Sequence, residues 1–266
     1  MKRPLATRIL PNRFKESLYY RYYHTRHADW RGLFESAPLA FAPHITMHGL
    51  LPGDVISGNI AFNGFYELPL SQRIAGLARR GTTFVDVGAN MGYFSLLWAG
   101  VNPNGRAIAF EAAPRNVAMI EKNIAANHLT DRVTLVPKAA GDRSGTITFD
   151  VGPAEQTGWG GISPADSATT IDVPVVRIDE ELPNMPIDVL KIDVEGADTW
   201  VLRGCEALLK ARQIRLIFFE QHTERMGKLG IAEGEAQMFL RDLGYDCSRV
   251  GGDDRGWTAY PSQRTA

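Results

Sequence analysis

The chain has 266 residues, enough for one large domain or for a catalytic domain with an extension, and it can bury a core without disulfides or metals. Hydrophobic residues make up 44% and charged residues 22%, which is ordinary for a globular protein. The formal net charge of -1 provides no overall field that would attract nucleic acid, so we expect no nucleic-acid partner.

The two cysteines, Cys205 and Cys247, lie far apart in the sequence and show no metal-ligand spacing, which argues against a zinc site or a disulfide framework. Residues 1–11 are basic and lack the apolar stretch of a secretory signal. No segment approaches ~18 consecutive apolar residues, the length that a transmembrane helix requires. These features predict a cytoplasmic protein without a transmembrane segment.

The first 31 residues form a basic and aromatic segment, with eight Lys or Arg against two Asp or Glu. Phe14, Leu18 and Tyr22 recur at helical spacing and predict an amphipathic helix. We expect its apolar stripe to pack against the main domain, whereas an exposed stripe would suit a glycan or glycolipid surface. Further along, Pro and Gly recur, and the segments Ile45–Leu50 and Val55–Phe62 are predicted as short strands of a hairpin.

From Thr82 onward, predicted strands alternate with predicted helices. The strands are Thr83–Val87, Arg106–Phe110, Val133–Val136, Thr146–Asp150, Asp188–Ile192 and Ile214–Phe219. The helices are Tyr93–Gly100, one that begins at Pro114, one whose buried face runs from Val201 to Leu209, and Ile231–Leu243, before a closing hairpin near residues 245–250 and 257–260.

This alternation predicts an α/β, Rossmann-like fold with a doubly wound, mostly parallel sheet. We place this domain at residues 81–260, after an N-terminal extension of helices and a β-hairpin (1–80) and before a tail (261–266). In such sheets the ligand lies outside the carboxyl ends of the strands, so motifs at those ends carry the functional information.

The segment FVDVGANMGYF joins the first of these strands to its helix. Gly88 and Gly92, with Asn90 between them, allow positive φ and a close approach of the backbone to a ligand. A dinucleotide fingerprint would require glycine at the positions of Asn90 and Tyr93. Asp86 would repel a pyrophosphate but could pair with a cationic amino-acid group. The turn therefore favours a ligand that carries positive charge.

Glu111 ends the second strand, 23 residues after Gly88. A carboxylate at this place can accept hydrogen bonds from both hydroxyls of a ribose. Dehydrogenases use the same device, so Glu111 by itself indicates only the ribose of an adenosine.

Five motifs, taken in order, resemble those of the FkbM family of methyltransferases: VDVGANMGYFSL, AFEAAPRNVAMIEKNIAAN, LVPKAAGD, DVLKIDVEGADTWVLRG and IFFEQH. The resemblance covers about residues 56–222, and its most specific part is KIDVEG in the fourth main strand. It implies a class I methyltransferase fold with S-adenosyl-L-methionine as cofactor, generally for O-methylation of sugars or natural products.

The resemblance also implies roles for single residues. Asp86, Gly88 and Asn90 would line the methionine end of the cofactor. Glu111 would hold the ribose, and Asp142 would accept a hydrogen bond from the adenine amine.

The catalytic candidates stand at the ends of the fourth and fifth strands. An alcohol acceptor must lose a proton, and Asp193, Glu195 or His222 could take it, without a ground for choosing among them. Lys191 shares one side of the strand with Asp193 and Glu195, so it could instead pair with one of these acids. The three candidates could also hold a divalent metal, but we assign none.

The segment Thr157–Ser163 contains Trp159 among glycines. It is either a lid on which a sugar stacks or an ordinary mobile loop. The expected partner is a small-molecule or glycan acceptor. Two alternatives remain open from the sequence: an NAD-dependent oxidoreductase on the same fold and a non-catalytic cofactor-binding protein.

Overall fold

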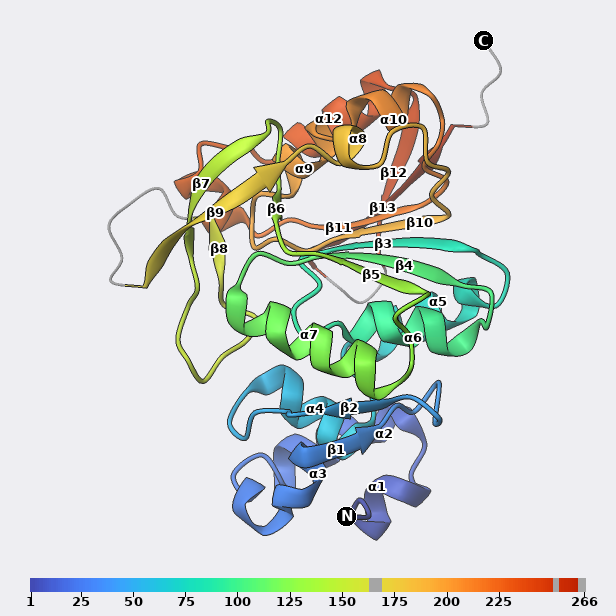
Figure 1. Ribbon diagram of the computed structural model, residues 1–266, viewed down its shortest axis with the longest axis vertical. Helices are drawn as coiled ribbons and strands as arrows, with labels where there is room; N and C mark the ends of the chain where they lie inside the picture. The colour runs from blue at the N-terminus through green and yellow to red at the C-terminus, as the bar shows by residue number, and fades with distance from the viewer. Residues whose placement is uncertain (163–168, 251–253, 263–266) are drawn as a thin grey trace.

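The computed structural model describes residues 1–162, 169–250 and 254–262. Its centre is a β-sheet with helices on both faces (Figure 1). In this part of the chain the sheet has seven strands. In spatial order they are β12 (Tyr245–Arg249), β13 (Gly256–Pro261), β11 (Ile217–Glu220), β10 (Val189–Ile192), β3 (Thr83–Val87), β4 (Arg106–Phe110) and β5 (Val133–Val136). Strands β11 to β5 run parallel, whereas β13 is antiparallel to both of its neighbours. This is the doubly wound, mostly parallel sheet that we expected.

Helices cover both faces of this sheet because its strands carry apolar side chains on both sides. One face packs on α5 (Leu68–Ala78), α6 (Tyr93–Val101) and α7 (Pro114–Ala126) (Figure 1). The other packs on α8 (Ile178–Glu181), α9 (Asp198–Arg203), α10 (Glu206–Lys210) and α12 (Glu235–Asp242), while α11 (Thr223–Lys228) follows β11. The helix predicted around Val201–Leu209 is thus two helices. The break falls at Gly204, which is packed so closely on Gly141 that a Cβ would collide with its carbonyl group.

A second sheet of four strands lies beside the carboxyl ends of the main strands. It is formed by β6 (Ala139–Ala140), β9 (Thr170–Val176), β7 (Gly145–Asp150) and β8 (Gly161–Ile162), in that spatial order within the described residues. Strand β7 was predicted, and β9 was not. The sheet places residues 151–160, between β7 and β8, against the end of the main sheet.

The extension consists mainly of helices. They are α1 (Leu5–Ile9), α2 (Asn12–Tyr22), the 3-10 turn η1 (His27–Trp30), α3 (Arg31–Glu35) and α4 (Val55–Asn63), with the antiparallel pair β1 (Ser36–Pro38) and β2 (Thr46–His48). Strand β2 lies within the segment predicted as Ile45–Leu50. No helix in the described ranges has the length and apolar character needed to cross a membrane.

The prediction of a strand at Val55–Phe62 is wrong, because this segment is the helix α4. Asp54 caps it by accepting a hydrogen bond from the Ser57 amide at 2.7 Å, and Gly64 ends it at φ 81°. Nearly every side of the helix is buried, so its sequence shows no helical period, and an apolar run of this length cannot be distinguished from a buried strand.

The predicted packing of the stripe on α2 is also wrong. Phe14 and Tyr22 are each 49% exposed, and the buried face carries Tyr19 instead. The rings of Tyr19 and Tyr23 lie 5.2 and 5.3 Å from that of Phe62 in α4. Because Tyr19 and Tyr23 are four residues apart, they share a face, and their contact with α4 orients the helix.

The extension shares one hydrophobic core with the α5–α7 side of the main sheet. Asn123 of α7 and Asn127, which caps the end of this helix, accept hydrogen bonds from the backbone amides of His48 and Thr46, both at 2.7 Å. The boundary that we placed after residue 80 falls between α5 and β3. Of the predicted tail, Pro261 belongs to β13, and residues 263–266 lie outside the described residues.

Candidate active site

A cavity of about 320 Å³ opens at the carboxyl ends of β3, β4, β10 and β11. The order of the strands along the chain reverses between the adjacent strands β3 and β10. The cavity therefore lies at the switch point of the sheet, where ligands bind in open α/β folds. The start of α4 and residues 156–162 complete the wall. The extension is therefore part of the cavity, which the sequence did not indicate.

The glycine turn after β3 forms the floor of the cavity. Gly88, Asn90 and Gly92 have φ values of 74°, 55° and 84°, which glycine adopts freely and asparagine tolerates. Gly88 also passes so close to β10 that a Cβ would collide with the carbonyl oxygen of Asp193. Both facts explain why glycine occupies this position.

Glu111 lies at the end of β4 with its carboxylate held by the backbone. Its Oε2 accepts from the Asn90 amide and its Oε1 from the Ala113 amide, both at 2.8 Å. The side chain is only 6% exposed, and burial raises the pKa of its carboxyl to about 7. Glu111 lines the cavity, and a carboxylate can accept more hydrogen bonds than these two, as the binding of a ribose diol requires.

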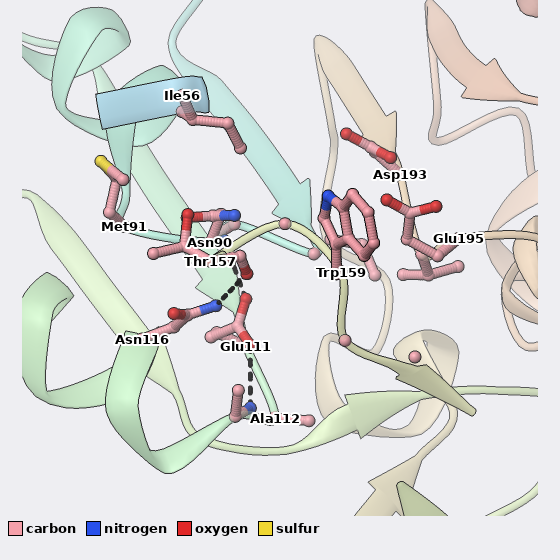
Figure 2. A pocket seen from close by; sticks show the side chains of 18 of the residues that line it. Ile56, Asn90, Met91, Glu111, Ala112, Asn116, Thr157, Trp159, Asp193 and Glu195 are labelled. Atoms are coloured by element: carbon pink, nitrogen blue, oxygen red, sulfur yellow. Dashed lines mark hydrogen bonds between the residues drawn. The ribbon is translucent and has the colours of Figure 1, made fainter. Parts of the chain in front are cut away.

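Two amide oxygens on the same wall have no hydrogen-bond partner within the described residues: Oδ1 of Asn90 and Oδ1 of Asn116. Asn116 is 3% exposed, and its Nδ2 donates to the carbonyl oxygen of Thr157 at 3.1 Å. Figure 2 shows Asn90, Glu111 and Asn116 together on one side of the pocket. Buried acceptors without donors fit a ligand that brings hydroxyl or amine groups, as a nucleoside does.

Asp86 is fully buried and does not line the cavity. Its Oδ2 accepts from Ser95 Oγ at 2.8 Å, and its Oδ1 lies 3.6 Å from Lys191 Nζ. Lys191 Nζ also lies 3.3 Å from Asp193 Oδ2 and 5.2 Å from the ring centroid of Phe94. Burial disfavours the charge of Lys191, but Asp193 and Asp86 outweigh this effect and raise its pKa. The cation that Asp86 pairs with is thus a side chain of the protein.

Carboxylates gather at the opposite end of the cavity, where Asp193, Glu195, Glu220 and Glu67 all contribute to the wall. Burial, and after it the charge of Asp193, raises the pKa of Glu195 to about 7 and that of Glu220 to about 8. Glu195 has φ 56°, a conformation uncommon outside glycine, and its Oε2 lies 3.3 Å from Arg225 Nη1.

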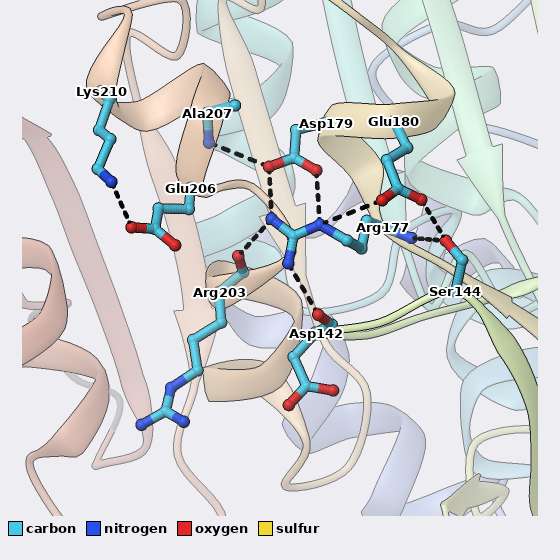
Figure 3. A network of polar contacts seen from close by, with 9 residues as sticks. All are labelled: Asp142, Ser144, Arg177, Asp179, Glu180, Arg203, Glu206, Ala207 and Lys210. Carbon is cyan, nitrogen blue, oxygen red and sulfur yellow. Dashed lines mark hydrogen bonds and ion pairs between the residues drawn. The ribbon is translucent and has the colours of Figure 1, made fainter.

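Besides Asp86, two further predicted site residues lie outside the cavity wall. His222 precedes α11 and does not line the cavity. Asp142 follows β6, where its backbone carbonyl accepts from Arg177 Nη1 at 2.8 Å in the network of Figure 3. Among the described residues, no group of three or more His, Cys, Asp or Glu is placed to hold a metal ion, so Asp193, Glu195 and His222 do not form such a group.

Residues 153–160 are held in place by several hydrogen bonds. Asp54 Oδ1 accepts from the Thr157 amide at 2.8 Å and from Thr157 Oγ1 at 3.1 Å. Arg115 donates to the carbonyl oxygens of Pro153 and Gln156, both at 2.9 Å. Trp159 is 58% exposed and lies on the side of the pocket that carries Asp193 and Glu195 (Figure 2). The expected lid includes Ser163, which lies outside the described residues.

The sequence pointed to Asp193, Glu195, Gly88, Asn90 and Glu111, and the structure brings all five to one cavity. It missed Asn116 and Asp54. The D-x-x-S pattern of a helix cap could have indicated Asp54, but a cap signal does not predict a contact with residues 103 positions away.

Comparisons with known proteins identify the family of the chain. Residues 86–247 match the family model of the methyltransferase FkbM domain. The chain is 26% identical over 204 residues to the methyltransferase sdnD of Sordaria araneosa, which covers 62% of this chain and 74% of that protein.

Two solved structures show a limited similarity in fold. A precorrin-6y C5,15-methyltransferase from Geobacter metallireducens GS-15 aligns with a TM-score of 0.44 and 16% identity over 74% of this chain and 90% of its own. An O-methyltransferase from Bacillus cereus aligns with a TM-score of 0.42 and 14% identity over 73% and 81%. The family model spans well over half of the 266 residues. The chain belongs to the FkbM family of S-adenosylmethionine-dependent methyltransferases.

Proposed function

We propose that the protein is an O-methyltransferase that methylates a hydroxyl group of a saccharide, a glycolipid or a natural product. The observation that carries this proposal is the division of one cavity into two ends. One end offers Glu111 and two unpartnered amide oxygens, and the other offers a cluster of carboxylates that includes Glu195. A nucleoside fits the first end, and a hydroxyl that must lose a proton fits the second.

The residues of the first end suit S-adenosylmethionine. Glu111 would accept from the ribose hydroxyls, and the backbone at Gly88 and Asn90 would accommodate the methionine part. Asn116 Oδ1 is available for a further donor of the nucleoside. When bound, the cofactor supplies a methyl group that is already activated by its sulfonium.

Glu195 is our choice for the general base. Its pKa of about 7 matches the operating range in which a carboxylate takes a proton efficiently. Both acids lie 3.3 Å from a cation, but Lys191, the partner of Asp193, is buried, whereas Arg225, the partner of Glu195, is partly exposed. The role of Asp193 would therefore be to hold the lysine and to orient the acceptor. In the transfer, Glu195 would take the proton of the acceptor hydroxyl as that oxygen receives the activated methyl group.

The acceptor end favours a neutral ligand that is rich in hydroxyl groups. Four carboxylate residues surround it, and they would repel a phosphate or a nucleic acid. They can accept several hydrogen bonds from a polyol, and the exposed ring of Trp159 offers a stacking surface for a sugar. These features also make an NAD-dependent oxidoreductase a poor alternative, because a pyrophosphate has no place beside them.

Two substitutions separate cofactor binding from chemistry. We expect Glu111→Ala to weaken the binding of S-adenosylhomocysteine by at least about tenfold in titration calorimetry, because two charge-assisted hydrogen bonds are lost. We expect Glu195→Gln to spare this affinity and to slow the transfer of a labelled methyl group to saccharide acceptors by about 10²- to 10⁴-fold. Glu206→Gln, at a partly exposed acid outside the cavity wall, serves as the matched control.

Three results would count against the proposal: unchanged affinity of the Glu111 variant, an unchanged rate of the Glu195 variant, or a label that reaches nitrogen acceptors only. A protein that binds the cofactor product but transfers no methyl to any extract component would be a non-catalytic binding protein.

A further inference from the structure

Residues 1–22, which contain the first two helices, hold six of the ten large apolar side chains that are exposed in the described part of the chain. These six are between 47% and 70% exposed: Met1, Leu5, Ile9, Phe14, Tyr20 and Tyr22. Elsewhere in the described residues, large exposed apolar side chains are limited to Val55, Trp159, Met238 and Tyr260. Val55 and Trp159 line the cavity, whereas the cluster on α1 and α2 has no role in it. Clustered exposed apolar groups mark an interaction surface.

Each of these helices presents a mixed apolar and cationic face to the solvent. In α1, Leu5 and Ile9 lie one turn apart, Arg8 is exposed beside them, and the buried Thr7 points the other way. These exposed side chains include no acid.

The exposed side of α2 carries Arg13, Phe14 and Arg21, opposite the Tyr19 side that packs on α4. The guanidinium of Arg13 lies 4.8 Å from the ring centroid of Phe14, and that of Arg21 lies 5.5 Å from the ring centroid of Tyr22. Glu16, the acid of this helix, is half-buried on the other side. Both helices therefore present apolar and cationic side chains together on their solvent-exposed faces.

The charge of the chain is distributed in the same way. The first 31 residues hold eight of the 29 Lys and Arg but two of the 30 Asp and Glu, so they carry +6 while the rest of the chain carries -7. Arg3 is turned inward and donates to backbone carbonyl groups of Ile60 and Ala61 in α4. Most of the other cations of the segment are exposed. The small overall charge thus conceals a strongly basic end of the molecule.

We propose that the exposed faces of α1 and α2 bind the surface of an anionic lipid bilayer. Leu5, Ile9 and Phe14 would enter the boundary between headgroups and acyl chains, and Arg13 and Arg21 would pair with lipid phosphates. A nucleic acid would need the cations but not the exposed leucine and isoleucine. A second copy of the chain would bring another surface of charge +6 against the first, and like charges oppose such a contact.

The test is sedimentation of the full chain with vesicles of phosphatidylcholine alone or mixed with phosphatidylglycerol. We expect binding to the anionic vesicles that weakens with added salt. Leu5→Ser combined with Ile9→Ser, and separately Arg13→Glu combined with Arg21→Glu, should each reduce the affinity at least about tenfold. The matched control for the apolar change is Met238→Ser, at an exposed apolar residue of α12. The control for the charge reversal is Lys210→Glu combined with Lys228→Glu, at exposed lysines that end α10 and α11. Both control proteins should bind as the wild type does.

Four outcomes would overturn the inference. They are absence of vesicle binding, equal binding to neutral vesicles, binding that survives the Leu5/Ile9 change but not the charge reversal, and a dimer in sedimentation velocity that the Leu5/Ile9 change dissolves. The third outcome would indicate a polyanion such as RNA, and the fourth a second copy. Equal melting temperatures of all variants would show that the changes act at the surface, and the binding readout is independent of methyl transfer.

Discussion

Replacing Lys191 with Met removes the cation that compensates the negative charge of the buried Asp86. Lys191 Nζ lies 3.6 Å from Asp86 Oδ1 and 3.3 Å from Asp193 Oδ2, and Asp86 has no exposed surface. Removal of one partner of a buried ion pair costs about 3–5 kcal/mol, because the remaining charge stays buried without compensation. Asp193 is partly exposed and can be solvated, so Asp86 accounts for most of this cost. For a chain of this size the loss corresponds to a fall in melting temperature of roughly 6–20 °C.

Thermal unfolding followed by calorimetry checks this prediction. The loss should be larger at pH 8 than at pH 5, because burial already raises the pKa of Asp86, and without Lys191 it can take up a proton at low pH. Adding Asp86→Asn to the Lys191→Met variant should restore most of the stability, since no buried charge then remains. Lys210→Met, which breaks the exposed pair with Glu206, is the control and should cost less than about 1 kcal/mol. The reasoning fails if Lys191→Met costs no more than this control, or if the double variant is no more stable than the single one.

Three further predictions follow from the cavity. The value of kcat should rise with pH with a midpoint near 7, because burial and the charge of Asp193 raise the pKa of Glu195 to about 7 and the base works in its ionised form. If the Glu195→Gln variant shows the same midpoint, this assignment is refuted. Asp54→Ala should cost about 1 kcal/mol as a lost helix cap and release Thr157, which hydrogen exchange would detect as faster exchange in residues 153–160; unaltered exchange there would contradict the role of this contact. Gly88→Ala should lower stability by about 2 kcal/mol or more and abolish binding of S-adenosylhomocysteine, because the new Cβ meets the Asp193 carbonyl at φ 74°; a stable variant with normal affinity would show that the turn can move.

The order of the main-sheet strands between Thr83 and Pro261 could be predicted from the sequence for a local reason. Parallel strands buried on both faces are short apolar runs, and the turns between them carry glycine and polar residues. The glycine turn and Glu111 follow directly from this order, since residues at carboxyl ends of adjacent parallel strands meet at one edge. The same reasoning brought Asp193 and Glu195 to the cavity.

The partners of these residues could not be predicted in this way. Asp86 pairs with Lys191 because β3 and β10 are adjacent, with these two residues in register, although they are 105 positions apart in sequence. His222 lies outside the cavity wall because the chain leaves β11 into α11, and the sequence alone does not give the direction of that turn.

The sequence by itself determined the fold class, the glycine turn after the first main strand and the family, because each depends on residues that are close along the chain or on the fixed order of the strands. Only the tertiary structure decided that Val55–Asn63 is a helix, that Asp54 holds Thr157 and that the free face of α2 carries Phe14 and Arg21. These features depend on which surfaces the extension buries against the domain. Contacts between segments that are distant in sequence determine which of these surfaces are buried, and local periodicity does not predict such contacts.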